Sequence, residues 1–107
     1  MIKRSKGFKK TRKPTDKESL NKMRDFFLSI WSKRRHYSEV SGTYLGSEPL
    51  SVYFHHILLK ERHQEAKFDE ENIILLSFDE HQNCHSDMYR YSEVNRRREL
   101  LKIKYEI

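Results

Sequence analysis

The sequence contains little cysteine and no long hydrophobic segment. Its one cysteine, Cys84, excludes an intrachain disulfide and a zinc site built from several thiolates. No apolar run approaches the roughly 20 residues that a transmembrane helix needs. The basic N-terminus leads into Pro14 and polar residues, where a signal peptide would have an apolar core. We therefore expect a protein of the reducing cytoplasm that is neither secreted nor inserted in a membrane.

The chain is short and polar. Its 107 residues correspond to one domain, and hydrophobic and charged residues each make up 36% of the sequence. The hydrophobic core of such a domain must be small, so we expect an additional stabilising element such as a bound metal ion. We place this single domain at residues 14–107.

Positive charge is concentrated at the N-terminus. Residues 1–13 contain seven lysines and arginines and no acid, and the rest of the chain is close to neutral although the overall charge is +6. This tail lacks apolar periodicity and is predicted to be disordered. Basic arms bind nucleic acid by releasing the counterions of its phosphates, and we predict such contacts for Lys9, Lys10, Arg12 and Lys13. A tail that only improves solubility is the alternative.

Helical periodicity marks the first folded segment. Thr15 followed by Glu18 matches a capping box, in which side chains bind the free amides at a helix start. Apolar residues then recur at helical spacing, at Leu20, Met23, Phe27 and Ile30. We predict an amphipathic helix from about 15 to between 31 and 35, whose apolar face packs in the core rather than against a partner.

The segments that follow alternate in character. Residues 37–54 are rich in aromatic, β-branched and turn-forming residues, which indicates short strands joined by turns. A polar loop at 60–71 precedes Ile73-Ile74-Leu75-Leu76, an apolar run with the length of a buried strand. Helices are predicted at 78–89 and from Ser92, as N-cap, to about Tyr105. The predicted fold class is therefore α+β.

Five of the six histidines lie between residues 55 and 85. His81 and His85 are four residues apart, so on a helix they share one face, with Cβ atoms about 5–6 Å apart, and can bind one ion. A solvated pair without a metal fits this spacing equally well. His55 can supply a third ligand if its strand packs against that helix, and His56 would then point to the opposite side of the strand.

The order of these residues is similar to that of a nuclease family. Tyr53-Phe54-His55-His56-Ile57 is followed by Asn72-Ile73-Ile74-Leu75-Leu76-Ser77 and then by His81-Gln82-Asn83-Cys84-His85. This order resembles the HNH endonucleases, also called ββα-metal or His-Me finger nucleases, and in particular colicin-type DNases and small phage or mobile-element members. The resemblance covers about residues 37–86. It implies a ββα-metal finger, with short antiparallel strands and a metal-binding helix, flanked by the N-terminal and C-terminal helices.

The resemblance also implies roles for the site residues. His55, His81 and His85 would bind one divalent ion, either a transition-type ion that imidazole favours, such as zinc, manganese or nickel, or magnesium. His56 would activate the attacking water, and Asn72 would hold the catalytic loop in shape. Taken alone, His56 also fits a surface histidine, and Asn72 also fits an ordinary turn residue.

One feature of many family members is missing. Those proteins carry two C-x-x-C pairs that bind a structural zinc, whereas the corresponding positions here hold Ser38, Ser41, Ser77 and Glu80. These side chains cannot form a thiolate site, so a second metal is not expected. Packing of the flanking helices must then hold the finger together. His63 matches no ligand position and is expected to be a loop histidine.

For this chain, the resemblance implies hydrolysis of DNA phosphodiester bonds, by nicking or double-strand cleavage. We expect contacts mainly to phosphates, which position DNA without reading its sequence, from the tail and from Arg34, Arg35, Arg62, Arg96 and Arg97. The protein would act as a monomer or weak homodimer, in the cytoplasm of the host cell if it is phage-encoded. Two alternatives are a non-catalytic, metal-stabilised nucleic-acid-binding domain and a nuclease that acts on RNA or branched DNA.

Overall fold

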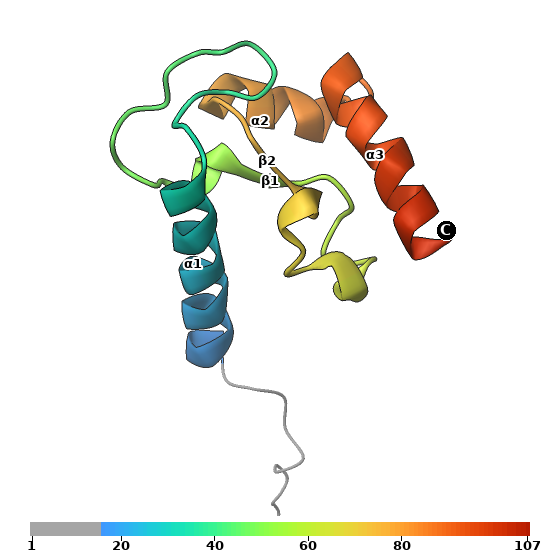
Figure 1. Cartoon of the computed structure of the whole chain (residues 1–107), viewed down its shortest axis with the longest axis horizontal. Helices are drawn as coiled ribbons and strands as arrows, with labels where there is room; N and C mark the ends of the chain where they lie inside the picture. Colours follow the sequence, from blue (N-terminus) through green and yellow to red (C-terminus); the bar gives the residue numbers. More distant parts are fainter. Residues whose placement is uncertain (1–15) are drawn as a thin grey trace, which may run out of the picture.

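Three helices and two short strands form the part of the chain that the computed structural model describes, residues 16–107 (Figure 1). They are α1 (Asp16–Lys33), β1 (Phe54–His56), β2 (Ile73–Leu75), α2 (Phe78–Ser86) and α3 (Ser92–Tyr105). Short 3-10 helices lie at Ser51–Tyr53, Gln64–Ala66 and Glu70–Asn72. The predicted α+β class is confirmed, whereas the predicted tail at 1–13 lies outside the described residues. Among the described helices, none is long and apolar enough to cross a bilayer.

The strands β1 and β2 form a two-stranded antiparallel sheet between the helices. Its register sets His55 opposite Ile74 and His56 opposite Ile73. Side chains of adjacent residues in a strand point to opposite faces. The imidazoles of His55 and His56 therefore leave the sheet on different sides, as the sequence predicts.

This sheet divides the hydrophobic core into two clusters. Alternate residues of the run 73–76 enter each cluster, as the two-residue period of a strand requires. One cluster joins α1 to the sheet and contains Ile30, Trp31, Leu45, Phe54, Ile73 and Leu75. The other packs on α2 and α3 and contains Ile57, Leu58, Ala66, Ile74, Leu76, Cys84, Val94 and Leu101. Accordingly, α1 and α3 lie on opposite sides of the sheet (Figure 1).

The apolar face of α1 is buried mainly toward its C-terminal end. Ile30 and Trp31 are buried there, and Met23 is buried two turns earlier, whereas Leu20 is 70% exposed. The N-terminal part of α1 projects past the sheet (Figure 1), so the prediction that Leu20 packs in the core is wrong. The predicted capping residue, Thr15, lies outside the described residues, and α1 begins at Asp16.

Two helix boundaries differ from the prediction. The α2 helix ends at Ser86 and not at 89, because Asp87 adopts an extended backbone conformation and its amide closes the last turn. The N-cap of α3 is Tyr91, and Ser92 is already helical, so the prediction of Ser92 as N-cap is wrong. Tyr91 provides no side-chain cap, so this helix start depends on its tertiary packing.

The segment 34–53 is largely irregular, although the sequence predicts short strands there. It contains an isolated bridge between Tyr37 and Tyr44 and the 3-10 turn Ser51–Tyr53. The hydroxyl of Ser38 accepts hydrogen bonds from the amides of Val40 and Ser41. Such local bonds compete with the hydrogen-bond ladder of a sheet, which explains why this segment forms a looped turn.

Candidate metal centre

The fold brings His55, His81 and His85 together, although the chain separates the first from the others. His55 lies on β1, and His81 and His85 lie one turn apart on α2. The ring centroid of His55 is 5.0 Å from that of His81 and 5.9 Å from that of His85, and the last two are 4.8 Å apart. One nitrogen from each ring can be chosen so that the three atoms lie within 4.8 Å of one another.

A backbone contact orients the ring of His81. Its Nδ1 lies 2.5 Å from the carbonyl oxygen of Val52. Because a carbonyl oxygen can only accept, Nδ1 carries the proton and Nε2 keeps its lone pair. Metal-ligating histidines commonly donate their second N–H to such a partner, which fixes the ring for the metal. Val52 belongs to the 3-10 turn that leads into β1, so the segment that carries His55 also orients His81.

Burial keeps His55 neutral. Its side chain lies in the interior, with 6% of the residue exposed. Desolvation, followed by the nearby imidazoles of His81 and His85, lowers the pKa of His55 to about 3. Burial also lowers the pKa of His81, against the opposing effect of its bond to Val52. Neutral imidazoles offer the lone pairs that a metal ion requires. At neutral pH, protons therefore do not compete with a metal ion for the nitrogens of His55 and His81.

These three imidazoles fit a divalent transition ion. In tetrahedral zinc sites the Zn–N distance is about 2.0–2.1 Å, which places ligand nitrogens about 3.4 Å apart. Small rotations of the rings, moving nitrogens by about 1 Å, would reach that spacing from the arrangement seen here. Within residues 16–107 the group contains no cysteine or acid. Three protein ligands leave an open coordination position, as in catalytic and not in closed structural sites.

His56 lies on the other side of β1 in a different environment. Its Nε2 is 3.0 Å from the carbonyl oxygen of Lys67, so this nitrogen carries the proton of the neutral ring. No described residue forms a hydrogen bond with Nδ1, the nitrogen that keeps the lone pair. Burial lowers the pKa of His56, the Lys67 carbonyl raises it, and the charge of Lys60 lowers it. The net shift is downward, so His56 can accept a proton at neutral pH.

All four of these histidines line one cavity of about 280 Å³. Its remaining walls are Phe27, Ser51, Phe54, Leu59, Lys60 and Glu61. Because β1 has only three residues, side chains from its two faces reach this cavity together. A phosphate group placed here would meet both His56 and the three imidazoles that could hold a metal ion.

Asn72 ties the loop that follows His56. It is fully buried, and its Oδ1 accepts a hydrogen bond of 2.7 Å from the amide of Leu58. Its Nδ2 donates to the carbonyl oxygens of Leu58 and Ala66, at 3.0 and 3.1 Å. The side chain thus clamps the two ends of the segment 58–66, a geometry that suits the loop-holding role implied by the resemblance.

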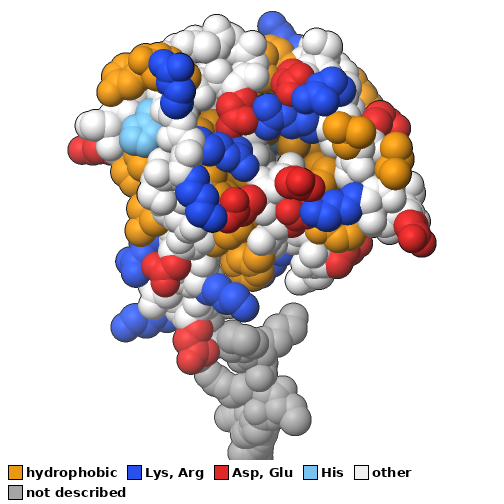
Figure 2. Space-filling view, in the orientation of Figure 1, with side chains coloured by type: hydrophobic (Ala, Val, Ile, Leu, Met, Phe, Trp, Pro, Cys, Tyr) orange, Lys and Arg blue, Asp and Glu red, His pale blue; other side chains and the backbone are white. Residues whose placement is uncertain are grey.

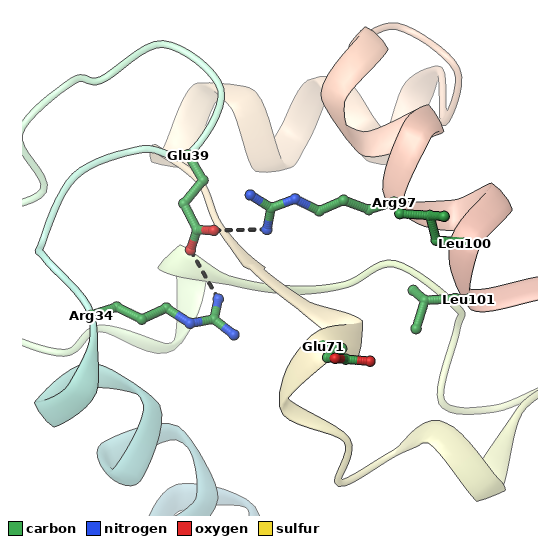
Figure 3. A pocket seen from close by; sticks show the side chains of 6 residues that line it. All are labelled: Arg34, Glu39, Glu71, Arg97, Leu100 and Leu101. Carbon is green, nitrogen blue, oxygen red and sulfur yellow. Dashed lines mark hydrogen bonds and ion pairs between the residues drawn. The ribbon is translucent and has the colours of Figure 1, made fainter. Parts of the chain in front are cut away.

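Two of the arginines expected to contact phosphate are half-buried and already paired with an acid. The carboxylate of Glu39 lies between Arg34 and Arg97, at 2.9 and 2.7 Å (Figure 3). Arg34 also donates to the carbonyl oxygens of Ile73 and Glu70. These residues border a cavity of about 400 Å³ that lies away from the four histidines. The phosphate role of Arg34 and Arg97 stays a prediction, but their guanidinium groups already link the 34–53 segment to β2 and to α3.

The other residues expected to contact nucleic acid are dispersed. Arg96 forms two hydrogen bonds with Glu93, at 2.7 and 3.0 Å. Arg35 lies over the ring of Tyr37, with Cζ 5.1 Å from its centroid, and Arg62 is exposed on the loop after the His55-His56 pair. The remaining members of this prediction lie outside the described residues: Lys9, Lys10, Arg12 and Lys13.

Sequence reasoning missed the two groups that orient the imidazoles, Val52 and Lys67. In both cases the acting atom is a backbone carbonyl oxygen. Every residue has such an atom, so no side-chain signal in the sequence marks these two. His63 takes no part in the group and lies 3.8 Å from Glu65 instead.

No protein-family model matches this chain, and neither a curated protein nor a solved structure matches it. The likeness to HNH nucleases therefore depends on the sequence pattern alone.

Proposed function

We propose that this protein is a metal-dependent HNH endonuclease that hydrolyses phosphodiester bonds in DNA. One observation carries the proposal: a single cavity is lined by four imidazoles. Those of His55, His81 and His85 are suited to bind one ion, and the fourth, that of His56, has its proton on Nε2 and a free lone pair on Nδ1. The antiparallel strands β1 and β2 followed by α2 support a ββα-metal finger. A metal site that only stabilised the fold would have no use for this fourth imidazole.

Each group has one task in the proposed reaction. His55, His81 and His85 would hold one divalent ion, which supplies Lewis-acid stabilisation of charge on the phosphate when bound. Nδ1 of His56 accepts a proton from the water whose oxygen attacks phosphorus, the bond between phosphorus and the 3′ oxygen breaks, and the 3′ oxygen takes up a proton from solvent. The carbonyl oxygen of Lys67 accepts a hydrogen bond from Nε2 of His56 throughout the reaction and stabilises the imidazolium that forms. The products would carry a 5′-phosphate and a 3′-hydroxyl.

The test separates hydrolysis from metal binding. Supercoiled plasmid is incubated with the full chain in magnesium, manganese, nickel or zinc, and metal affinity is measured by calorimetry on the same preparations. We expect His56→Ala to lower the nicking rate by about 10²–10⁴-fold, the usual contribution of a general base, with metal affinity retained. His85→Ala should lose both metal binding and nicking, because it removes a ligand without disturbing the core.

His63→Ala provides the matched control, since it removes an imidazole from the same region but not from the cavity. It should nick at the parent's rate. A His56→Ala protein that cuts as fast as the parent would show that the base is wrongly assigned. No cleavage in any of the four metals, combined with salt-dependent DNA binding, would instead favour the non-catalytic binding module.

The same chemistry fits RNA or branched DNA, which share the phosphodiester group. Comparing rates on single-stranded, duplex and junction substrates, and on RNA, decides among them. We favour duplex DNA because of the resemblance to DNases, and a rate on another substrate that exceeds the duplex rate by ten-fold or more would change that assignment.

A further inference from the structure

Ion pairs already neutralise most cations on α3 and at the end of α1. The cations paired with acids are Lys33, Arg34, Arg96, Arg97, Lys102 and Lys104. On the face shown in Figure 2, blue and red side chains alternate across the centre of the molecule. A phosphate that bound there would have to displace an acid from each cation. These residues are therefore poor sites for a polyanion.

Three lysines that lie near His56 or Phe68 have no acidic partner within the described chain: Lys22, Lys60 and Lys67. Lys60 lines the cavity that contains His56. Lys67 is the residue whose carbonyl binds His56. The ammonium groups of Lys22, on α1, and of Lys67 lie 4.8 and 5.4 Å from the ring centroid of Phe68. We call these three residues the lysine path, because they lead from the cavity across the 67–68 loop to α1.

The surroundings of the lysine path favour an anionic strand. Glu61 is the one acid among the residues that line the cavity, and Asp25 on α1 lies 3.9 Å from Arg24. Phe68, which lies between two of the lysines, is 36% exposed and packs edge-on against Phe26 at 5.4 Å. Aromatic rings set among cations are typical of surfaces that bind nucleic-acid strands.

We propose that the lysine path binds the phosphates of the DNA strand that is cut, an inference that rests on the proposed function. The strand would run from the cavity over the 67–68 loop and along α1. Lysine ammonium groups bind phosphate as point charges and read no bases. The contacts predicted from sequence for Arg34, Arg96 and Arg97 would then be replaced by lysines that the sequence does not distinguish from other surface charges.

The test measures DNA binding with chelator present, so that hydrolysis plays no part. The triple variant Lys22→Gln, Lys60→Gln, Lys67→Gln is compared with the control variant Lys33→Gln, Lys102→Gln, Lys104→Gln in the full chain. Each variant removes three lysines, two exposed and one half-buried. Affinity for a short fluorescein-labelled duplex is measured by anisotropy over a range of salt concentrations. We expect the path variant to reduce the salt slope by about 2–3, at about 0.9 per phosphate contact, and the control variant to reduce it by less than 1.

A second variant guards against misfolding. Lys22→Arg, Lys60→Arg, Lys67→Arg should keep the affinity and slope of the parent, since the charges remain. Equal losses in the path and control variants, an unchanged path variant, or a parent that binds no duplex would each overturn the inference. If the parent binds through the lysine path but never cuts, the proposed hydrolysis fails, and of this inference only the binding of DNA phosphates by the lysine path stands. If the parent cuts DNA while the path variant binds as well as the parent, the proposed function stands and the lysine path is not the binding surface.

Discussion

The acid sensitivity of the metal-free protein depends strongly on one buried side chain, His55. In the folded protein its pKa is about 3, whereas the ordinary value is 6.5. Between these values the unfolded chain binds more protons than the folded one, so the free energy of unfolding rises with pH. The stabilisation linked to neutral His55 is therefore complete above about pH 6.5 and is lost progressively as the pH falls toward about 3.

We predict that chelator-treated protein loses on the order of several kcal/mol of unfolding free energy between about pH 7 and about pH 4. Urea unfolding at each pH measures this loss. His55→Gln removes the titrating ring and should flatten the pH dependence, even if it lowers stability at neutral pH. His63→Ala should leave the dependence as in the parent. A pH dependence that His55→Gln does not reduce would contradict the assignment.

Asn72 is predicted to matter for stability more than any exposed asparagine. Asn72→Ala leaves the buried amide and carbonyl of Leu58 without partners and removes one of the two donors to the carbonyl of Ala66, which should cost about 2–4 kcal/mol of unfolding free energy. Asn72→Asp should cost at least as much, because a carboxylate cannot donate to either carbonyl. Asn21→Ala, at an exposed position on α1, should change stability by less than about 0.5 kcal/mol. Chemical unfolding of the three variants checks the ranking, and equal effects of Asn72→Ala and Asn21→Ala would contradict it.

At the scale of elements, a hydrogen-bonded cluster ties the 34–53 segment to α2. Ser38 donates to Glu80 at 2.6 Å, and Glu80 also accepts the amide of Ser77 in a capping box. Burial raises the pKa of Glu80, but hydrogen bonds from Ser38, Ser41 and Ser77 bring it below its usual value. With Ser41, these residues hold the four positions that correspond, in the resemblance to HNH nucleases, to the zinc-binding cysteines of many members of that family. Here a carboxylate surrounded by hydroxyls occupies the centre of the group.

We predict that Glu80→Ala lowers the unfolding free energy by about 1–3 kcal/mol, since it leaves a buried serine hydroxyl and a helix-start amide without their acceptor. Asp79→Ala removes the other acid from the first turn of α2 and serves as the control. It loses only the favourable interaction of a negative charge with the helix dipole, which should lower the unfolding free energy by about 0.3–1 kcal/mol. Glu80→Gln should fall between the two, because it keeps one acceptor oxygen. Thermal and urea unfolding measure these differences. A loss in Asp79→Ala equal to that in Glu80→Ala would show that only the dipole matters.

Elements with strong local signals were predictable, and those determined by tertiary contacts were not. The helices and β2 were found because apolar periodicity and run length are properties of a short window. The strands expected in 37–54 are wrong because the Ser38 hydroxyl binds the following amides and prevents a ladder. Leu20 fits the helical stripe but lies where α1 projects past the sheet. A short window of sequence shows which face of a helix is apolar, but it does not show how far along the helix the neighbouring sheet extends.

At the scale of the whole molecule, the candidate site was predictable to the extent that side chains define it. The approach of His55 to His81 and His85 follows from a strand and a helix that must pack together in a small core. Val52 and Lys67 act through their backbone carbonyl groups, so no side-chain pattern marks them. The ion pairs of the arginines were a further feature that the sequence did not reveal. Their charges are conspicuous in the sequence, but the sequence does not show that Glu39 pairs with both Arg34, five residues before it, and Arg97, 58 residues after it.

A bound ion should stabilise the whole protein, because it would join β1 to α2 through His55, His81 and His85. Such a link matters in this domain, since the sheet divides its hydrophobic core into two small clusters. An ion that binds only the folded state, at about 100 times its dissociation constant, adds about 2.7 kcal/mol to the unfolding free energy. In a domain of this size each kcal/mol raises Tm by about 4–8 °C, so we predict a shift of about 10–20 °C that chelator reverses.

The variant His85→Ala makes this shift specific to the site. His85 is exposed, so its removal should leave the metal-free Tm close to that of the parent, while the ion-dependent shift falls to a few degrees or less. His63→Ala should keep the full shift, which excludes an effect of losing any imidazole. Differential scanning calorimetry with and without zinc measures all three proteins. If His85→Ala gained as much from zinc as the parent, the ion would have to bind elsewhere, and β1 and α2 would not be joined through these imidazoles.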